Sequence, residues 1–266
     1  MFRKSLIVAS LALLAVGAGS PASADPKFLE SYDQIYGGRT FLPSEGDPRP
    51  MTALQASPSD VENPTSRILA APFIRSSDLP GGLGDLLTYG VSLGYANSGS
   101  GLPWQIGVSL FNTHVDVERF GFEDDFFGFA VGGKVVIWEP QNANLPAVSL
   151  NVGYQDQDDV AQRWDVALAA DQRLTDTLFA TVNLGWSHID PDFFRDDSDF
   201  IAAIGATWNP FDRLSFSASY TFDNDVDLED FWAITATYAA NENLILQLGG
   251  GKHSTIFGSF IWKWDR

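Results

Sequence analysis

The sequence predicts an all-β fold, a single antiparallel up-and-down barrel of twelve transmembrane strands. Apolar and polar residues alternate over most of the chain after residue 67, and strict alternation indicates strands with two different faces. Aromatic residues gather near the ends of the alternating segments, and short connections alternate with longer ones. A water-soluble sandwich would share the alternation. The aromatic positions and the recurrence of the pattern favour the membrane barrel.

The clearest alternation is the hairpin Leu214 to Tyr238. Serine and threonine residues such as Ser217 and Thr235 occupy its polar face. Successive side chains leave a strand on opposite sides, so these two faces meet different surroundings. The apolar face consists of Leu214, Phe216, Ala218, Tyr220, Phe222, Trp232, Ile234, Ala236 and Tyr238.

Residues 1–24 have the layout of a secretory signal peptide. The positively charged pair Arg3-Lys4 precedes the apolar run Leu6 to Val16, and the small residues Ala22-Ser23-Ala24 form a cleavage site. The apolar run is too short for a membrane helix, which needs about 20 residues. We therefore expect the mature chain to begin at Asp25, and no later segment predicts a transmembrane helix.

Composition excludes two classes of function. The chain has no cysteine, so disulfides and thiolate chemistry are absent. Its formal net charge is −18. A surface this acidic repels nucleic acid, and no basic patch is found, so we expect no nucleic-acid partner.

Residues 25–67 differ from the rest of the chain. An apolar face of a short helix is predicted first, and a stretch rich in proline, serine and acidic residues follows it. Such a stretch cannot form a sheet. We expect a periplasmic extension that is a linker or tail, or else a partial plug of the barrel. The helical face consists of Phe28, Leu29, Tyr32, Ile35 and Tyr36.

Residues 68–266 form the predicted barrel. The first strand is the weakest, because Pro72 cannot donate to a β-ladder, and its loss would leave eleven or ten strands. A β-bulge is expected near Phe111, where the alternation loses phase. An even strand number is typical of single-chain barrels. The expected strands are Ile68 to Arg75, Leu87 to Ala96, Trp104 to Val117, Phe126 to Trp138, Ala147 to Gln155, Arg163 to Ala170, Leu178 to Trp186, Phe200 to Trp208, the two arms of the Leu214 to Tyr238 hairpin, Leu244 to Gly251 and Ile256 to Trp264.

The connections between the strands are predicted to fall into two groups. Short turns would lie at one end of the barrel. Because the strand number is even, both termini would lie at this same end, which is periplasmic in such barrels. The other end would carry longer, Asp-rich loops, with Lys252 to Thr255 as a short exception. These longer loops are Ser76 to Asp85, Glu118 to Asp125, Asp156 to Gln162, Ile189 to Asp199 and Asp223 to Asp230.

The chain resembles the Gram-negative outer-membrane β-barrel proteins, including porins. A leader, amphipathic strands, aromatic residues near strand ends and a final strand Phe260-Ile-Trp-Lys-Trp264 carry this resemblance. It implies an outer-membrane location, contact with membrane lipid and lipopolysaccharide, and insertion by the barrel-assembly machinery. Members often end on an aromatic residue, whereas here Asp265 and Arg266 follow Trp264.

We predict no catalytic residue. Outer-membrane lipases and deacylases use a His-x-Ser pair, which places base and nucleophile on one face of a strand. Here His114 is next to Thr113, His188 follows Ser187 and His253 precedes Ser254. Adjacent residues face opposite sides, so none of these pairs supplies an activated nucleophile.

We also predict no metal ligand and no cofactor-binding residue. The acidic runs Asp223 to Glu229 and Asp190 to Asp199 carry hard oxygen ligands suited to calcium or magnesium. The EF-hand pattern fails there, because its glycine and its flanking helices are missing. A solvated acidic rim is the simpler interpretation.

The predicted inner face is small and polar, with Lys134, Arg163, Asp165 and Lys263 as its charged residues. Such a lining favours a water-filled pore or room for the N-terminal segment. The leading hypothesis is a passive channel for small solutes with an acidic, cation-favouring extracellular mouth. The alternatives are a non-conducting barrel that serves as anchor or adhesin and a lipid-modifying enzyme. The sequence leaves solute and oligomeric state open.

Overall fold

The computed structural model describes residues 66–78, 84–97, 104–117, 121–138, 145–158, 161–175, 177–191, 197–211, 214–222, 231–241, 244–251 and 254–265. The predicted signal peptide and nearly all of the predicted extension lie outside these residues. Within them, no helix is long and apolar enough to cross a membrane.

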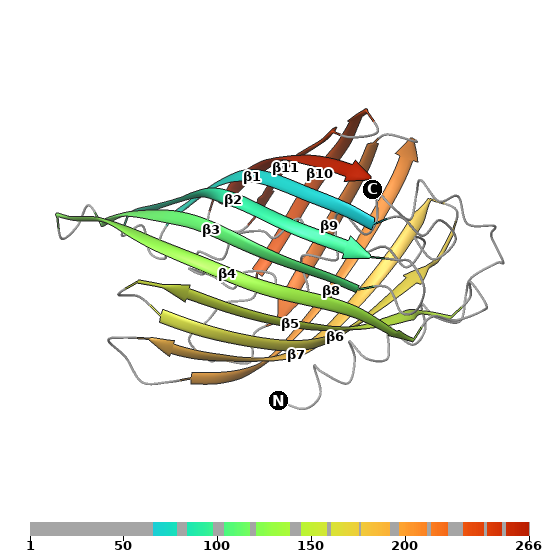
Figure 1. Ribbon diagram of the computed structural model, residues 1–266, viewed down its shortest axis with the longest axis horizontal. Helices are drawn as coiled ribbons and strands as arrows, with labels where there is room; N and C mark the ends of the chain where they lie inside the picture. Colours follow the sequence, from blue (N-terminus) through green and yellow to red (C-terminus); the bar gives the residue numbers. More distant parts are fainter. Residues whose placement is uncertain are drawn as a thin grey trace.

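Twelve antiparallel strands form one closed barrel, which confirms the predicted fold (Figure 1). Each strand pairs with its neighbours in sequence, and β1 pairs with β12 to close the sheet. The weak first strand therefore forms, and the count is twelve. The strands are β1 (Ser66–Asp78), β2 (Asp85–Asn97), β3 (Trp104–Val117), β4 (Phe122–Trp138), β5 (Ala147–Gln157), β6 (Ala161–Arg173), β7 (Leu178–Pro191), β8 (Asp197–Phe211), β9 (Leu214–Phe222), β10 (Phe231–Asn241), β11 (Leu244–Gly251) and β12 (Ile256–Asp265).

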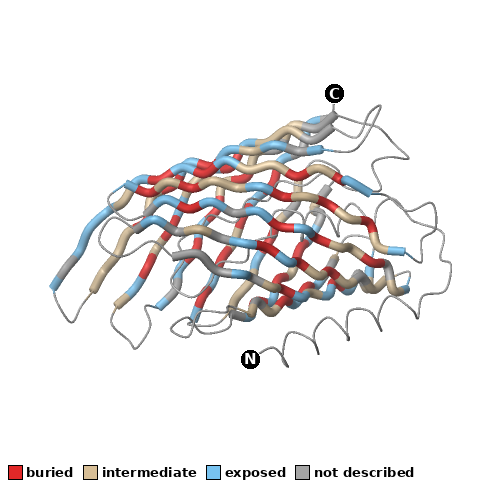
Figure 2. The backbone as a smooth tube through the Cα atoms, turned by 90° about the horizontal axis from the view of Figure 1, so that it is seen from below, coloured by how far each residue is buried: buried red, intermediate tan, exposed pale blue. Residues whose placement is uncertain are grey.

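The alternation of the sequence becomes the inner and outer faces of the barrel. In β10, Ile234 faces outward and is 55% exposed, whereas Thr235 faces inward and is 0% exposed. Buried and exposed residues alternate in this way along the tube in Figure 2. Large apolar side chains such as Leu93, Leu168 and Trp208 are exposed on the outer face. Burial of this belt against lipid replaces the hydrophobic core that a water-soluble barrel would need.

Pro72 interrupts the seam that closes the barrel. The β1–β12 register runs to Ala70↔Trp262 and resumes at Phe73↔Ser259 with the same offset. On the other side of β1 the pairing is continuous through Pro72↔Val91. The missing N–H of a proline explains a gap on one side only. The strand survives because its second ladder is complete.

The predicted bulge near Phe111 is wrong. The registers of β3 with β2 and with β4 are continuous across Phe111. This residue points into the barrel and is 2% exposed, so the apparent loss of phase is an apolar side chain on the inner face. Register irregularities occur instead between Val136 and Trp138, between Trp208 and Phe211, and between Ala239 and Asn241.

The phenyl rings of the inner face lie against glycines of neighbouring strands. Phe73, Gly90, Phe111 and Gly128 are register partners in a row from β1 to β4. A Cβ atom on Gly90 would lie 2.8 Å from Phe73 Cζ and 2.8 Å from Phe111 Cβ. Phe257 covers its partner Gly249 in the same way. Glycine at these positions leaves the space that each ring occupies, an arrangement that pins the register.

The predicted difference between short turns and long loops is mostly wrong. The strands extend into the predicted loops, so that only residues 158–160 separate β5 from β6 and only 192–196 separate β7 from β8. The gap of 223–230 between β9 and β10 agrees with the prediction. β4 begins at Phe122, inside a predicted loop, and the β3–β4 hairpin projects beyond its neighbours (Figure 1). Cross-strand pairing outcompetes the turn preference of the acidic residues there.

Candidate functional site

The candidate site is the inner face of the barrel together with one rim. We call the end where β1 begins and β12 ends the terminal end, and the opposite end the acidic end. Small and polar residues cover much of the inner face, as predicted. Neighbouring strands are linked there by side-chain hydrogen bonds, of 3.1 Å between the hydroxyls of Thr88 and Thr113 and 2.7 Å between those of Ser92 and Ser109.

Charged residues lie on this inner face. Lys134 Nζ is 3.8 Å from Asp171 Oδ2, and both side chains are buried. The hydroxyl of Thr181 donates a hydrogen bond of 2.6 Å to the other oxygen of Asp171. Arg163 lies on the inner face, as predicted, and its side chain is buried, as is that of Arg75. The inner face thus holds partnered charges rather than a uniform polar lining.

Sequence reasoning missed Arg75 and Asp171. Both follow from the alternation, since Arg75 is two residues beyond Phe73 and Asp171 continues the inward series of Ala167 and Ala169. Asp171 was missed because its strand was predicted to end one residue earlier. Two further predicted inner charges, Asp165 and Lys263, have side chains outside the described part of the structure.

Carboxylates gather at the acidic end. Four of them are register partners in one row across β1 to β4, in the order Asp78, Asp85, Asp116 and Glu123. Alternation places this row on the outer face, and like charges at opposed positions repel one another. The described acidic residues at this end are Asp78, Asp85, Asp116, Glu123, Asp124, Asp125, Asp156, Asp158 and Asp190.

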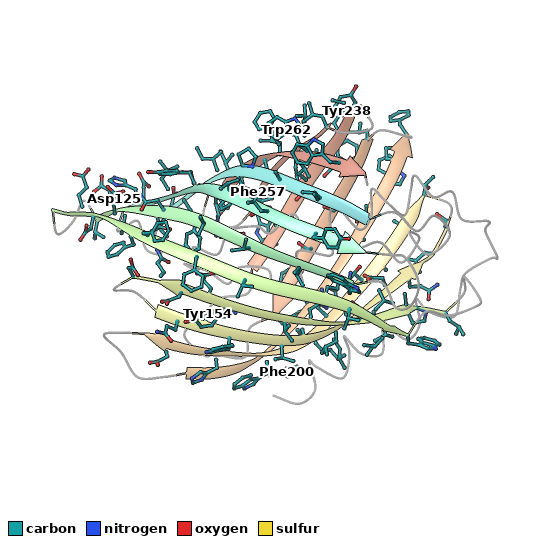
Figure 3. All side chains as sticks on the ribbon, viewed as in Figure 1. Asp125, Tyr154, Phe200, Tyr238, Phe257 and Trp262 are labelled. Atoms are coloured by element: carbon teal, nitrogen blue, oxygen red, sulfur yellow. The ribbon has the colours of Figure 1, made fainter. Side chains whose placement is uncertain are left out.

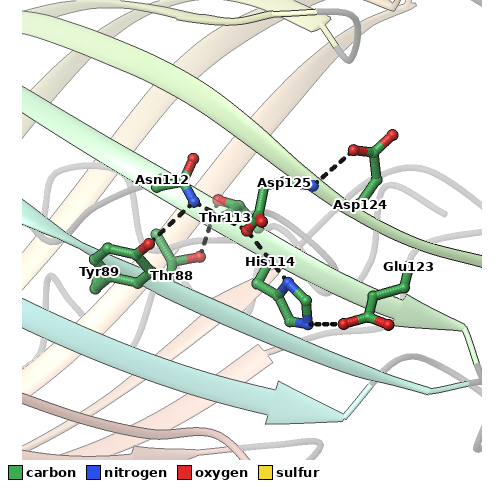
Figure 4. Close-up of polar contacts among 8 residues, drawn as sticks. All are labelled: Thr88, Tyr89, Asn112, Thr113, His114, Glu123, Asp124 and Asp125. Carbon is green, nitrogen blue, oxygen red and sulfur yellow. Dashed lines mark hydrogen bonds and ion pairs between the residues drawn. The ribbon is translucent and has the colours of Figure 1, made fainter.

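A hydrogen-bonded group lies beside this row on the projecting β3–β4 hairpin (Figure 4). His114 Nδ1 is 3.2 Å from Asp125 Oδ1, and its Nε2 is 3.5 Å from Glu123 Oε1. Asn112 Nδ2 donates to the same Asp125 oxygen and to Tyr89 Oη. All of these contacts are solvent-exposed, so each contributes little to stability.

The described contacts of His114 and His188 place no nucleophile beside either imidazole ring. The partners of His114 are the two carboxylates, while its neighbour Thr113 points inward to Thr88. His188 stacks on Trp186 on the outer face, with ring centroids 5.8 Å apart. The third histidine, His253, lies outside the described residues, and the side chain of Ser187 is not described.

Metal ligation has no support in the described ranges. No group of three or more His, Asp or Glu side chains there is placed to hold a metal ion. The run Asp223 to Glu229, which carried the metal hypothesis, lies outside the described residues, and so does most of the other acidic run.

Aromatic side chains lie near both ends of the barrel. Figure 3 shows Tyr238 and Trp262 near the terminal end, with Asp125 at the acidic end. Several rings contact one another, including Tyr95 with Trp104 at 5.6 Å and Tyr154 with Trp164 at 4.3 Å between centroids. Tyrosine and tryptophan have an apolar body and a polar atom, which suits the membrane–water interface. Together with the apolar outer face, they define a membrane-spanning band.

Structural comparison identifies the fold. The translocator domain of the autotransporter NalP from Neisseria meningitidis superimposes with a TM-score of 0.58 and 8% identity, over 75% of this chain and 87% of that chain. The chain folds as an outer-membrane β-barrel. The COG4313 outer membrane channel from Pseudomonas putida F1 superimposes with a TM-score of 0.57 and 10% identity, over 76% of this chain and 96% of that chain. The KdgM porin in complex with disordered oligogalacturonate superimposes with a TM-score of 0.50 and 7% identity, over 74% of this chain and 98% of that chain.

No protein-family model and no curated protein sequence matches this outer-membrane β-barrel. The likeness to the solved barrels is therefore one of fold. It agrees with the resemblance found in the sequence and, with the exposed apolar belt, supports the predicted place in the outer membrane.

Proposed function

We propose that this barrel is a passive channel for small solutes, with a mouth at the acidic end that favours cations. The observation that carries the proposal is the segregation of the two faces, apolar outside and largely polar inside, in a closed twelve-stranded barrel. A polar inner wall is what a solute pathway needs. The similarity to an outer membrane channel and to a porin supports this function.

The acidic end supports the proposed selectivity. Carboxylates from six strands lie at that rim, and their field raises the local concentration of cations. Membrane lipid and lipopolysaccharide are the proposed neighbours of the outer face, small solutes those of the inner face. The function requires no covalent chemistry.

Planar-bilayer recording tests the proposal. Refolded mature protein should give stepwise currents, and a salt gradient should show a preference for potassium over chloride. Replacing Asp124 and Asp158 by asparagine should reduce that preference and leave the currents in place. An absence of current steps from folded protein would refute the channel, whereas anion preference would refute only the proposed role of the rim.

A second function, a non-conducting anchor or adhesin, is favoured by one observation. The small side chains of the inner wall are buried rather than open to water, with Ser92 and Thr207 both at 0% exposure. A barrel whose interior stays filled would not conduct. Such a protein would give no current steps with or without residues 25–64, and its acidic end would bind to a surface or partner.

A further inference from the structure

The ladder between β1 and β12 is interrupted in the middle of the barrel wall. Pro72 lies midway along β1, and by the constant offset of the register its counterpart on β12 is Phe260. Since the pairing of β1 with β2 is continuous, the missing donor lies on the β12 side, and one hydrogen bond of the seam is absent. The other register irregularities, in β4, β8 and β10, lie at the ends of those strands. Among the described ladders, only the seam is interrupted at mid-strand.

This interruption lies at the level of the lipid. The register partner of Pro72 on β2 is Val91, whose partner on β3 is Leu110, and both side chains are exposed in the apolar outer belt. Water is excluded at that depth and cannot replace a missing ladder bond, so the seam is weakest there. β1 and β12 are also the one pair of neighbouring strands that do not follow each other in sequence. Their ladder and side-chain packing hold the seam closed without the help of a connecting turn.

The inner face beside the seam is apolar, in contrast to most of the inner wall. Ala71 and Phe73 of β1 and Phe257 and Ile261 of β12 are buried there, on either side of the interruption. Among the side chains that the structure describes, every buried apolar one larger than alanine lies on β12 or on β1 to β4, whereas β5 to β11 contribute only alanines. These larger side chains are Phe73, Leu86, Phe111, Val136, Phe257 and Ile261. The inner wall thus has an apolar sector, and the interrupted seam lies within it.

Apolar side chains line both sides of the wall at this point. On the outer face, Phe260 is 54% exposed and its ring stacks on that of Trp262, with centroids 6.4 Å apart. Ile261, between them in sequence, faces inward. Apolar side chains beside a water-filled lumen forfeit part of the stabilisation that burial gives. Their concentration at the one ladder that is interrupted at mid-strand, among those described, therefore points to a solute of the same chemistry.

We propose that β1 and β12 separate locally at Pro72 and let small apolar molecules pass sideways between the lumen and the lipid. A local separation breaks few ladder bonds, because one is already missing at its centre. The proposal rests on the proposed channel for the entry of the solute into the lumen. It extends that function from polar solutes, which pass along the lumen, to apolar solutes, which leave it through the wall.

Two engineered disulfides test this path, since the natural chain contains no cysteine. Ile74→Cys with Gly258→Cys ties β1 to β12 beside the interruption, where these residues are register partners. Val91→Cys with Leu110→Cys ties β2 to β3 at the same level and is the matched control. Directly opposed Cα atoms are about 4.5–5.5 Å apart, a separation that a disulfide spans. An added Cβ on Gly258 would meet its nearest neighbour at 3.4 Å, so a cysteine fits there.

The probe is N-phenyl-1-naphthylamine, an apolar dye that fluoresces when it enters lipid. It is added to Gram-negative cells that carry the full-length barrel in their outer membrane, and to the same cells without the barrel. The barrel should raise the initial rate of dye entry several-fold. Oxidation of the β1–β12 cysteine pair should return the rate to that of cells without the barrel, and reduction should restore it. Oxidation of the β2–β3 pair should leave the rate unchanged.

A single substitution at the interruption gives a second readout. Pro72→Val supplies the missing N–H donor and keeps an apolar, strand-forming side chain on the outer face. It should slow dye entry roughly two- to tenfold, because one more ladder hydrogen bond must be broken at each opening. Heat-modifiable migration on gels confirms that each variant is folded before its rate is compared.

Two results would overturn the proposal. Dye entry that is no faster with the folded barrel than without it would show that apolar molecules do not pass. Dye entry that persists after the β1–β12 disulfide has formed would show that they do not use the seam. Salt currents in planar bilayers without seam-dependent dye entry would retain the channel and refute the seam path. Seam-dependent dye entry without salt currents would support the path and refute ion conduction.

Discussion

Asp85 on β2 lies directly opposite Asp116 on β3, at the acidic end of the barrel. Asp78 and Glu123 extend the same row on either side. Opposed side chains in an antiparallel sheet have Cβ atoms about 4.5–5.5 Å apart, so the row concentrates negative charge against the cross-strand pairing. The repulsion within this row lowers the stability of the folded barrel, and the row makes the rim strongly acidic.

Neutralising one carboxylate of this row should stabilise the barrel. Asp85→Asn removes two like-charge contacts and should raise the free energy of unfolding by about 0.2–1 kcal/mol. Urea unfolding in lipid vesicles measures this change, and the gain should shrink at high salt because of screening. Asp190→Asn is the matched control, since its register partner on β6 is the uncharged Gln162. An equal gain from both variants would contradict the role of the row.

Gly128 should not tolerate a larger side chain. Its register partner Phe111 fills the space where a Cβ atom would lie. Gly128→Ala should therefore lower the free energy of unfolding by about 1–3 kcal/mol. Gly258→Ala is the control, because the nearest atoms to its added methyl would be at 3.4 and 3.8 Å. If both variants unfold at the same denaturant concentration, the ring does not pack on Gly128.

Lys134 and Asp171 should stabilise the folded barrel jointly, so that the effects of replacing them are not additive. Lys134→Met removes the cationic Nζ that lies 3.8 Å from the buried Asp171 carboxylate, which should cost about 3 kcal/mol. Adding Asp171→Asn removes the carboxylate that has lost this cation and should recover much of that loss. Unfolding of the two single variants and the double variant measures the coupling. Additive effects would show that the pair does not interact.

Ile234 and Thr235 test the two faces of β10. Ile234→Arg places a charge against lipid and should cost about 2–4 kcal/mol near mid-membrane. Thr235→Arg points inward and should allow folding while changing conductance or selectivity. Heat-modifiable migration on gels reports folding, and bilayer recording reports the second effect. Equal folding of the two variants in lipid would mean that the assignment of faces is wrong.

The sequence by itself determined which residues share a face. Because side chains alternate with a period of two, the positions of Lys134, Arg163 and Ile234 follow directly from their neighbours. The same pattern, with an even number of segments, predicted twelve strands and the closed barrel. Two of the charged residues predicted on the inner face, Lys134 and Arg163, have described side chains, and both lie on that face.

Tertiary structure alone decided the ends of the strands, the register and what fills the interior. Pairing with a neighbour extends β4 to Phe122 and β6 to Arg173, through residues whose local preference is for turns. The fit of Phe111 between Gly90 and Gly128 depends on three strands at once, so the alternation of a single strand misread it as a bulge. The row from Asp78 to Glu123 depends likewise on four strands. Local periodicity fixes the direction of each side chain, but its neighbours are set by cross-strand pairing between residues far apart in the chain.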